Sequence, residues 1–171
     1  MKESILDATR EALLAVRGLR FYRTERGFHG RFYCALMESL DHRGFLNEET
    51  VLEMEYQKSA RHGTHQRPDI LLHTPAEVTG ALVTHNNYAV WALKRHASIE
   101  VAREDFDKLD DMFRTLEYPL GIFINVDARE NQIEHYCGSY RERLCGCAVW
   151  LDNGTPNVLI SCGDKNPDEG G

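Results

Sequence analysis

The sequence lacks long apolar runs. No stretch reaches the roughly 18 apolar residues that a membrane-spanning helix needs, and residues 1–20 contain no uninterrupted apolar segment of the signal-peptide kind. We therefore expect a protein of the cytoplasm with no membrane partner. The chain has 171 residues with 42% apolar content, which is enough for one domain with its own core, spanning 1–171.

The sequence also lacks an excess of positive charge. Its formal net charge is -7, so the chain as a whole does not attract polyanions. A nucleic-acid partner would need a local basic patch, a metal ion or a basic companion protein. The candidate basic residues are Lys58, Arg61, Arg67, Lys94 and Arg95. For Lys58 and Arg61, ordinary solvated loop charges remain an equally good interpretation.

Cysteines are few and poorly spaced for metal binding. The chain has five, an odd number, and in a reducing compartment we expect them to be free thiols. Four of them (Cys137, Cys145, Cys147 and Cys162) lie near one another in sequence but form no C-x-x-C pair, so we favour small buried apolar residues over zinc ligands. There is also no glycine-rich phosphate loop, which disfavours a nucleotide-cofactor enzyme.

Hydrophobic periodicity predicts alternating helices and strands. Apolar residues recur every three or four positions over 4–19, 26–42 and 100–116, which indicates helices. Strands are expected over 51–57, 69–73, 88–94, 122–126, 147–151 and 158–162. The strand-helix-strand passage over 88–126 should be a parallel crossover, and the earlier strands should be antiparallel. The predicted fold is mixed α/β (α+β), a mixed sheet flanked by helices with a C-terminal β-hairpin.

Two short segments carry the chemistry. In Arg67-Pro68-Asp69-Ile70-Leu71-Leu72-His73 an acid opens an apolar strand, and in Ala89-Val90-Trp91-Ala92-Leu93-Lys94-Arg95 a lysine closes another. Adjacent strands can bring such groups within a few ångströms. Magnesium prefers carboxylates, a backbone carbonyl and retained waters. A nearby lysine can orient or deprotonate an attacking water, or stabilise a pentavalent phosphate.

This layout resembles the PD-(D/E)XK nuclease superfamily, the restriction-endonuclease-like proteins. The resemblance covers a core of about 25–126 and also includes Glu55-Tyr56, the Asn86-Asn87 turn and Gly121-Ile122-Phe123-Ile124. It implies a nuclease that hydrolyses phosphodiester bonds of DNA or RNA with Mg²⁺ (or Mn²⁺). It further implies a nucleic-acid substrate, a homodimer or a larger complex, and a place in restriction, repair or phage-defence systems.

The resemblance also implies roles for individual residues. Asp69 and the Leu93 carbonyl would hold the metal, Lys94 would support the nucleophile, and Glu25 or Glu55 would complete the site. Glu38 competes with Glu25 on the same predicted helix, and His29 lies four positions after Glu25. Residues that would contact the nucleic acid are Gln57, Lys58, Arg67 and Arg95. His62, His65 and His73 are better interpreted as ordinary histidines than as ligands.

Each of these residues also has a purely structural interpretation. Asp69 after proline is typical of a turn or a strand start, and Lys94 would serve equally well as a solvated residue at a strand end. Glu25 favours a helix N-terminus by its charge, and Glu55 would face solvent from its strand. The ordered context of the two motifs favours the functional interpretation.

Ala92 departs from the superfamily pattern, which has an acid two residues before the lysine. Three explanations stay open: the acid has migrated to another element, as Glu55 or Glu25; the chain is naturally inactive; or Ala92 replaces a metal ligand by design. The alternative function is therefore a catalytically inactive module that binds nucleic acid or a protein partner. We expect Ala92→Glu to restore or strongly increase magnesium-dependent cleavage.

Overall fold

The computed structural model describes residues 1–54, 68–75 and 85–163, and these form a six-stranded mixed sheet. Its strands are β1 (Val51–Met54), β2 (Ile70–His73), β3 (Asn87–Arg95), β4 (Gly121–Val126), β5 (Leu144–Asp152) and β6 (Thr155–Cys162), side by side in that order. β1, β2 and β3 are antiparallel, β3 to β5 are parallel, and β6 returns antiparallel to β5. The predicted mixed sheet, parallel crossover and C-terminal hairpin are confirmed.

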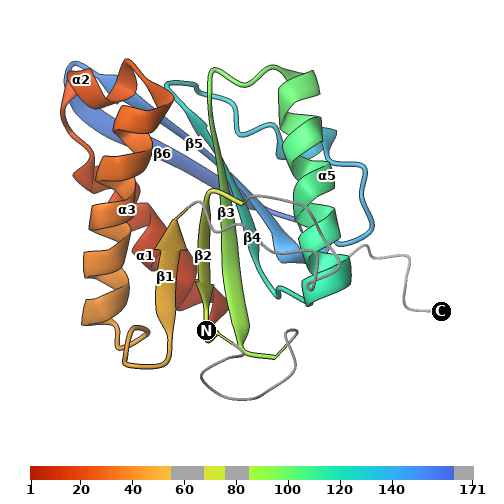
Figure 1. The fold of residues 1–171 in the computed structure, drawn as a ribbon. Coiled ribbons are helices and arrows are strands. Elements are labelled where there is room, and N and C mark those ends of the chain that lie inside the picture. Colours follow the sequence, from red (N-terminus) through yellow and green to blue (C-terminus); the bar gives the residue numbers. More distant parts are fainter. Residues whose placement is uncertain (55–67, 76–84, 164–171) are drawn as a thin grey trace.

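Helices cover both faces of this sheet (Figure 1). The N-terminal helices α1 (Lys2–Ala15), α2 (Leu19–Tyr22) and α3 (Glu25–His42) lie on one side, and α5 (Ile99–Leu116) lies on the other. Two short 3₁₀ turns, η2 (Ile133–His135) and η3 (Arg141–Arg143), lead from β4 to β5. None of the helices in the described ranges is both long and apolar enough to traverse a bilayer.

The predicted single helix over 4–19 is wrong at both ends. The helix begins at Lys2 rather than at Ser4, and it ends at Ala15. Gly18 is extended, with φ -85° and ψ 122°, and starts α2. The Tyr22 hydroxyl donates a hydrogen bond to the Val16 carbonyl at 3.0 Å, so a tertiary contact takes up a carbonyl freed where the helix stops.

Strand alternation divides the core into two layers. Trp91 and Leu93 pack against α1 and α3, while Val90 and Ala92 pack against α5. Because side chains alternate along a strand, Lys94 points to the same side as Ala92. The Trp91 indole donates a hydrogen bond to Thr9 Oγ1 at 3.1 Å, so even this buried polar group has a partner.

The core-facing side of β1 is not buried along its whole length. Leu52 is buried, but Met54, two residues further on and on the same face, is 42% exposed. β1 is an edge strand of the sheet. The expected continuation to residue 57 lies outside the described residues.

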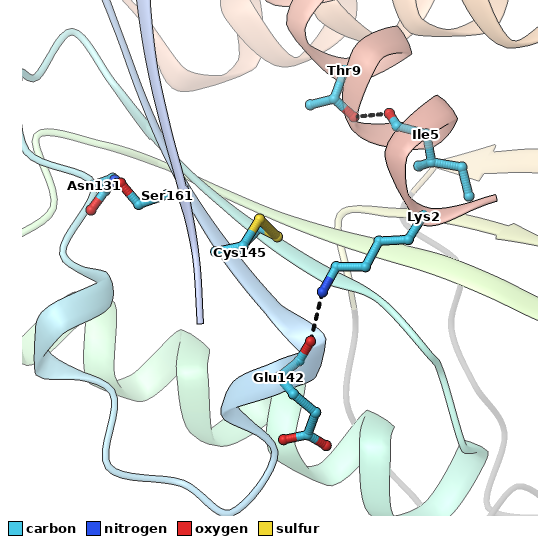
Figure 2. Close-up of a disulfide and its surroundings, with 8 residues drawn as sticks. Lys2, Ile5, Thr9, Asn131, Glu142, Cys145 and Ser161 are labelled. Atoms are coloured by element: carbon cyan, nitrogen blue, oxygen red, sulfur yellow. Dashed lines mark hydrogen bonds between the residues drawn. A yellow bond between two sulfur atoms is a disulfide. The ribbon is translucent and has the colours of Figure 1, made fainter. Parts of the chain in front are cut away.

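A disulfide joins Cys145 and Cys162, which corrects the expectation of free thiols (Figure 2). The two residues face each other in the β5–β6 ladder, so their side chains leave the same face at adjacent positions. Cys34, Cys137 and Cys147 keep their thiols. Cys147 is buried, and burial raises its thiol pKa to about 12, which fits its interpretation as a small apolar residue. Beside the disulfide, Lys2 Nζ donates to the Glu142 carbonyl at 2.6 Å.

Gly121 at the start of β4 tests how tightly α5 packs on the sheet, and Gly30 in α3 serves as its control. A methyl group on Gly121 would overlap the buried Phe113 ring, whereas one on Gly30 in α3 would meet no atom within 4 Å. We expect Gly121→Ala to lower the free energy of unfolding by about 1–3 kcal/mol through overpacking. Gly30→Ala should raise it by about 0.5–1 kcal/mol through helix propensity. Urea unfolding measures both, and equal effects would contradict the packing described.

Candidate functional site

Asp69 and Lys94 meet at the end of β3 through the backbone of Leu93. Asp69 Oδ2 accepts a hydrogen bond from the Leu93 N–H at 2.6 Å. Lys94 Nζ donates to the Leu93 carbonyl at 3.2 Å. The pairing of β2 with β3 ends at Trp91. Beyond that point the N–H and the carbonyl of Leu93 are available to the side chains of Asp69 and Lys94. The structure thus brings together the acid and the lysine predicted from the sequence.

Lys94 also lies near two further carboxylates. Its ammonium is 3.5 Å from Asp105 Oδ2 and 4.0 Å from Glu25 Oε1. Asp105 comes from α5 and Glu25 from α3, so helices on opposite faces of the sheet both reach this strand end. The Lys94 side chain is 27% exposed and Asp105 only 3%, which places the ion pair at the boundary between core and solvent.

Asp105 is the site residue that the sequence interpretation missed. Acids in an amphipathic helix ordinarily face solvent, yet Asp105 is buried on α5, as are Ala102, Phe106 and Leu109. Its Oδ1 pairs with Lys108 Nζ at 2.5 Å, while its buried Oδ2 makes no hydrogen bond. The signal was present in the sequence, because Asp105 lies three positions after Ala102 and four before Leu109, on the buried stripe.

Glu25 rather than Glu38 reaches the site. Thr24 caps α3 by accepting the Gly27 N–H, and Glu25 Oε2 accepts the Arg95 N–H at 3.2 Å. Glu38 is exposed and lies about 20 Å further along the helix. His29, one turn after Glu25, is buried, and its Nε2 has no hydrogen-bond partner within the described residues.

A small cavity of about 40 Å³ opens between Asp69, Ala92, Lys94 and Asp105. Ala92 lines this cavity together with Asp105, which comes from α5. A carboxylate from the helix therefore lies beside the position where the superfamily pattern has an acid on the strand.

Burial and ion pairing set the charge states. Burial raises the pKa of Asp69 above its usual range, although the Leu93 N–H, Lys94 and His29 oppose that rise. For Lys94, burial alone would lower the pKa, but Asp105, Asp69 and Glu25 outweigh it and leave the pKa raised. Lys94 is therefore an ammonium at neutral pH and can donate hydrogen bonds.

Several oxygen atoms near the end of β3 are of the kind that binds a hydrated divalent cation. Asp69, Asp105 and Glu25 supply three carboxylates against the ammonium groups of Lys94 and Lys108, which leaves an excess of negative charge. Magnesium takes one or two carboxylates and keeps several waters. Asp69, the unbonded Asp105 Oδ2 and the Leu93 carbonyl could provide such a set. Over residues 1–54, 68–75 and 85–163, no three His, Cys, Asp or Glu side chains converge as a ready-made ligand cluster.

Arg95, predicted to contact nucleic acid, has its guanidinium engaged within the chain. Its Nε donates to the Tyr22 carbonyl at 2.6 Å, and another of its nitrogens pairs with Asp127 at 2.9 Å. His73 pairs with Glu53 at 2.8 Å, away from the site. Glu55, Gln57, Lys58, His62, His65 and Arg67 lie outside the described residues.

Comparisons of this chain with protein-family models, curated proteins and solved structures find no match. The arrangement of side chains at the end of β3 is therefore the basis for a functional assignment.

The raised pKa of Asp69 yields a stability test. An acid whose folded-state pKa is raised contributes stability below its unfolded pKa, near 3.9, and loses it as pH rises through the folded pKa. We expect Asp69→Asn, which keeps an acceptor for Leu93, to be more stable than the parent chain at pH 7 and equally stable near pH 3. Denaturant unfolding across pH measures this.

The matched control is Asp107→Asn on the exposed face of α5, which should change the stability by less than about 0.5 kcal/mol. A destabilised Asp69→Asn at neutral pH would mean that the charge of Asp69 supports the fold.

Proposed function

We propose that this chain is a magnesium- or manganese-dependent nuclease of the PD-(D/E)XK type, acting on DNA or RNA. The observation that carries the proposal is the Lys94 ammonium between Asp69 and Asp105 beside the Leu93 carbonyl. The negative excess favours a cation over an anion as the first ligand, and among the described residues Asp105 Oδ2 makes no hydrogen bond beyond its ion pair with Lys94 at 3.5 Å.

In this proposal Asp105 takes the role of the acid that Ala92 lacks. Both residues line the same cavity with Asp69 and Lys94, so the acid migrates from the strand to α5. Asp69, Asp105 and the Leu93 carbonyl would hold the cation, which would polarise the phosphate and lower the pKa of a bound water. Lys94 stays charged and donates to a phosphate oxygen as negative charge builds up there. Water attacks phosphorus, the bond between phosphorus and the leaving oxygen breaks, and the proton that the water loses passes through solvent to the leaving oxygen.

The proposal predicts a rescue experiment. With Mg²⁺ or Mn²⁺ and panels of DNA and RNA, the parent chain should cut, and Asp69→Asn, Lys94→Met and Asp105→Asn should each lose at least about a hundredfold in rate. The double variant Asp105→Asn/Ala92→Glu should recover part of the activity, because the acid returns on the strand. Mg²⁺ should raise the thermal midpoint of the parent chain but not of Asp69→Asn.

Glu38→Gln, exposed on α3, serves as the matched control and should cut like the parent chain. If the parent chain is inert and Ala92→Glu alone is active, Asp105 does not replace the acid that the superfamily has at position 92. The proposed metal-dependent cleavage would still hold for the Ala92→Glu variant. If the parent chain, Ala92→Glu and the double variant are all inert on every substrate, the nuclease proposal fails.

The second candidate is a non-catalytic module of the same fold that binds nucleic acid or a protein. One observation favours it: both acids already have partners within the chain. Asp69 accepts a hydrogen bond from the Leu93 N–H at 2.6 Å, and Asp105 forms an ion pair with Lys108 at 2.5 Å. Binding without cleavage, unchanged by Mg²⁺ and by Asp69→Asn, would identify this function.

A further inference from the structure

A second hollow, of about 540 Å³, lies at the carboxyl ends of β3, β4 and β5. His96 and Ala97 line one side, residues 127–130 and Gln132 the other, and Trp150 and Leu151 the end of β5. It shares no lining residue with the cavity around Lys94. His96, which lines this groove, follows Lys94 by only two residues, so the two hollows are neighbours at the end of β3.

Two residues that line this groove each carry a buried polar atom with no hydrogen-bond partner within the described residues. Gln132 Oε1 is an acceptor, and its residue is only 7% exposed. Trp150 Nε1 is a donor. Buried polar groups are nearly always paired, so an orphaned acceptor and an orphaned donor in one groove call for a ligand that offers both functions.

The backbone around the groove is held in an unusual conformation. His96, Asp127 and Gln132 have φ values of 53°, 57° and 60°, a left-handed region that histidine and glutamine adopt only at a cost in free energy. Asn125 holds the loops on both sides, because its Oδ1 accepts the Ala97 N–H and its Nδ2 donates to the Glu130 carbonyl, each at 2.9 Å. Such strain is commonly found at binding sites.

The charges of the groove argue against a phosphate ligand. Asp127 is already paired with Arg95 at 2.9 Å and with His96 at 3.0 Å, and Glu130 adds another acid to the lining. The exposed Arg129 lies over the Trp150 ring, 5.2 Å from its centroid. A flat guanidinium on an indole is a stacking surface for a planar ligand.

We propose that this groove binds one unpaired nucleobase of the substrate, next to the phosphodiester at Lys94. The inference rests on the proposed nuclease function for its choice of ligand. A nucleobase offers a planar face to stack on Arg129, an acceptor for the Trp150 N–H, and an amino or imino N–H for Gln132 Oε1. Trp150 Nε1 and Gln132 Oε1 are buried in the free chain, so the base reaches them when neighbouring side chains shift, while Arg129 stays on the indole ring. The substrate is then single-stranded or opened at the cut.

Fluorescence of the full-length chain in EDTA tests the groove without catalysis. The chain has two tryptophans, and the other, Trp91, is fully buried, so ligand-dependent changes report on Trp150. The probes are the eight ribo- and deoxynucleoside 5′-monophosphates, with ribose 5-phosphate as the probe that lacks a base. We expect the nucleotides to bind at least about tenfold more tightly than ribose 5-phosphate.

Gln132→Met should weaken nucleotide binding about tenfold and change the order of preference among bases. Arg129→Gln should weaken all bases alike. The matched control is Arg20→Gln, because Arg20 is also exposed and lies over an aromatic ring, that of Phe21, at 4.7 Å; it should leave binding unchanged. Circular dichroism checks that each variant is folded. If Gln132→Met does not fold, Arg129→Gln still tests the groove, because Arg129 is exposed.

The groove assignment is overturned if no nucleotide binds up to millimolar concentration, if ribose 5-phosphate binds equally well, or if Arg129→Gln binds like the parent chain. If the chain cuts nucleic acid although one of these results is found, the nuclease proposal still holds. If nucleotides bind in EDTA but the chain cuts no substrate, the groove binds a base and the nuclease proposal is wrong.

Discussion

The Lys94 ammonium is the group on which the rest of the candidate site depends. Carboxylates from three separate elements approach it: Asp69 before β2, Asp105 on α5 and Glu25 on α3. Burying acids so close together is unfavourable unless a cation compensates them. The end of β3 is the place where this is possible, because helices from both faces of the sheet reach past the last strand pair there.

The proximity of Asp69 and Lys94 was predictable, because β2 and β3 are antiparallel neighbours and the start of one lies beside the end of the other. The mixed sheet followed from the hydrophobic periodicity of the chain. Asp105 was not found, since an acid in a helix rich in Glu, Asp and Arg was assigned to the solvent face. Only its position between Ala102 and Leu109 marks it as buried. The helix break after Ala15 was also missed, because it depends on a contact with Tyr22.

Ala92 has a different meaning in the folded chain than in the sequence. In the sequence it is a missing acid. In the structure it lines the same cavity as Asp105. The sequence named Glu55 or Glu25 as the migrated acid, and Asp105 is a further residue that could take that role.

The β5–β6 hairpin has a consequence for any solution study. Its two-residue turn, Asn153-Gly154 with both φ values positive, sets a register in which Asp152 faces Thr155 and Cys145 faces Cys162. The resulting bond closes a segment with a sequence separation of 17, and a loop of that size is worth about 3 kcal/mol in the chain-entropy description. Samples kept with and without dithiothreitol are therefore two covalently different molecules, whose melting curves should not be pooled.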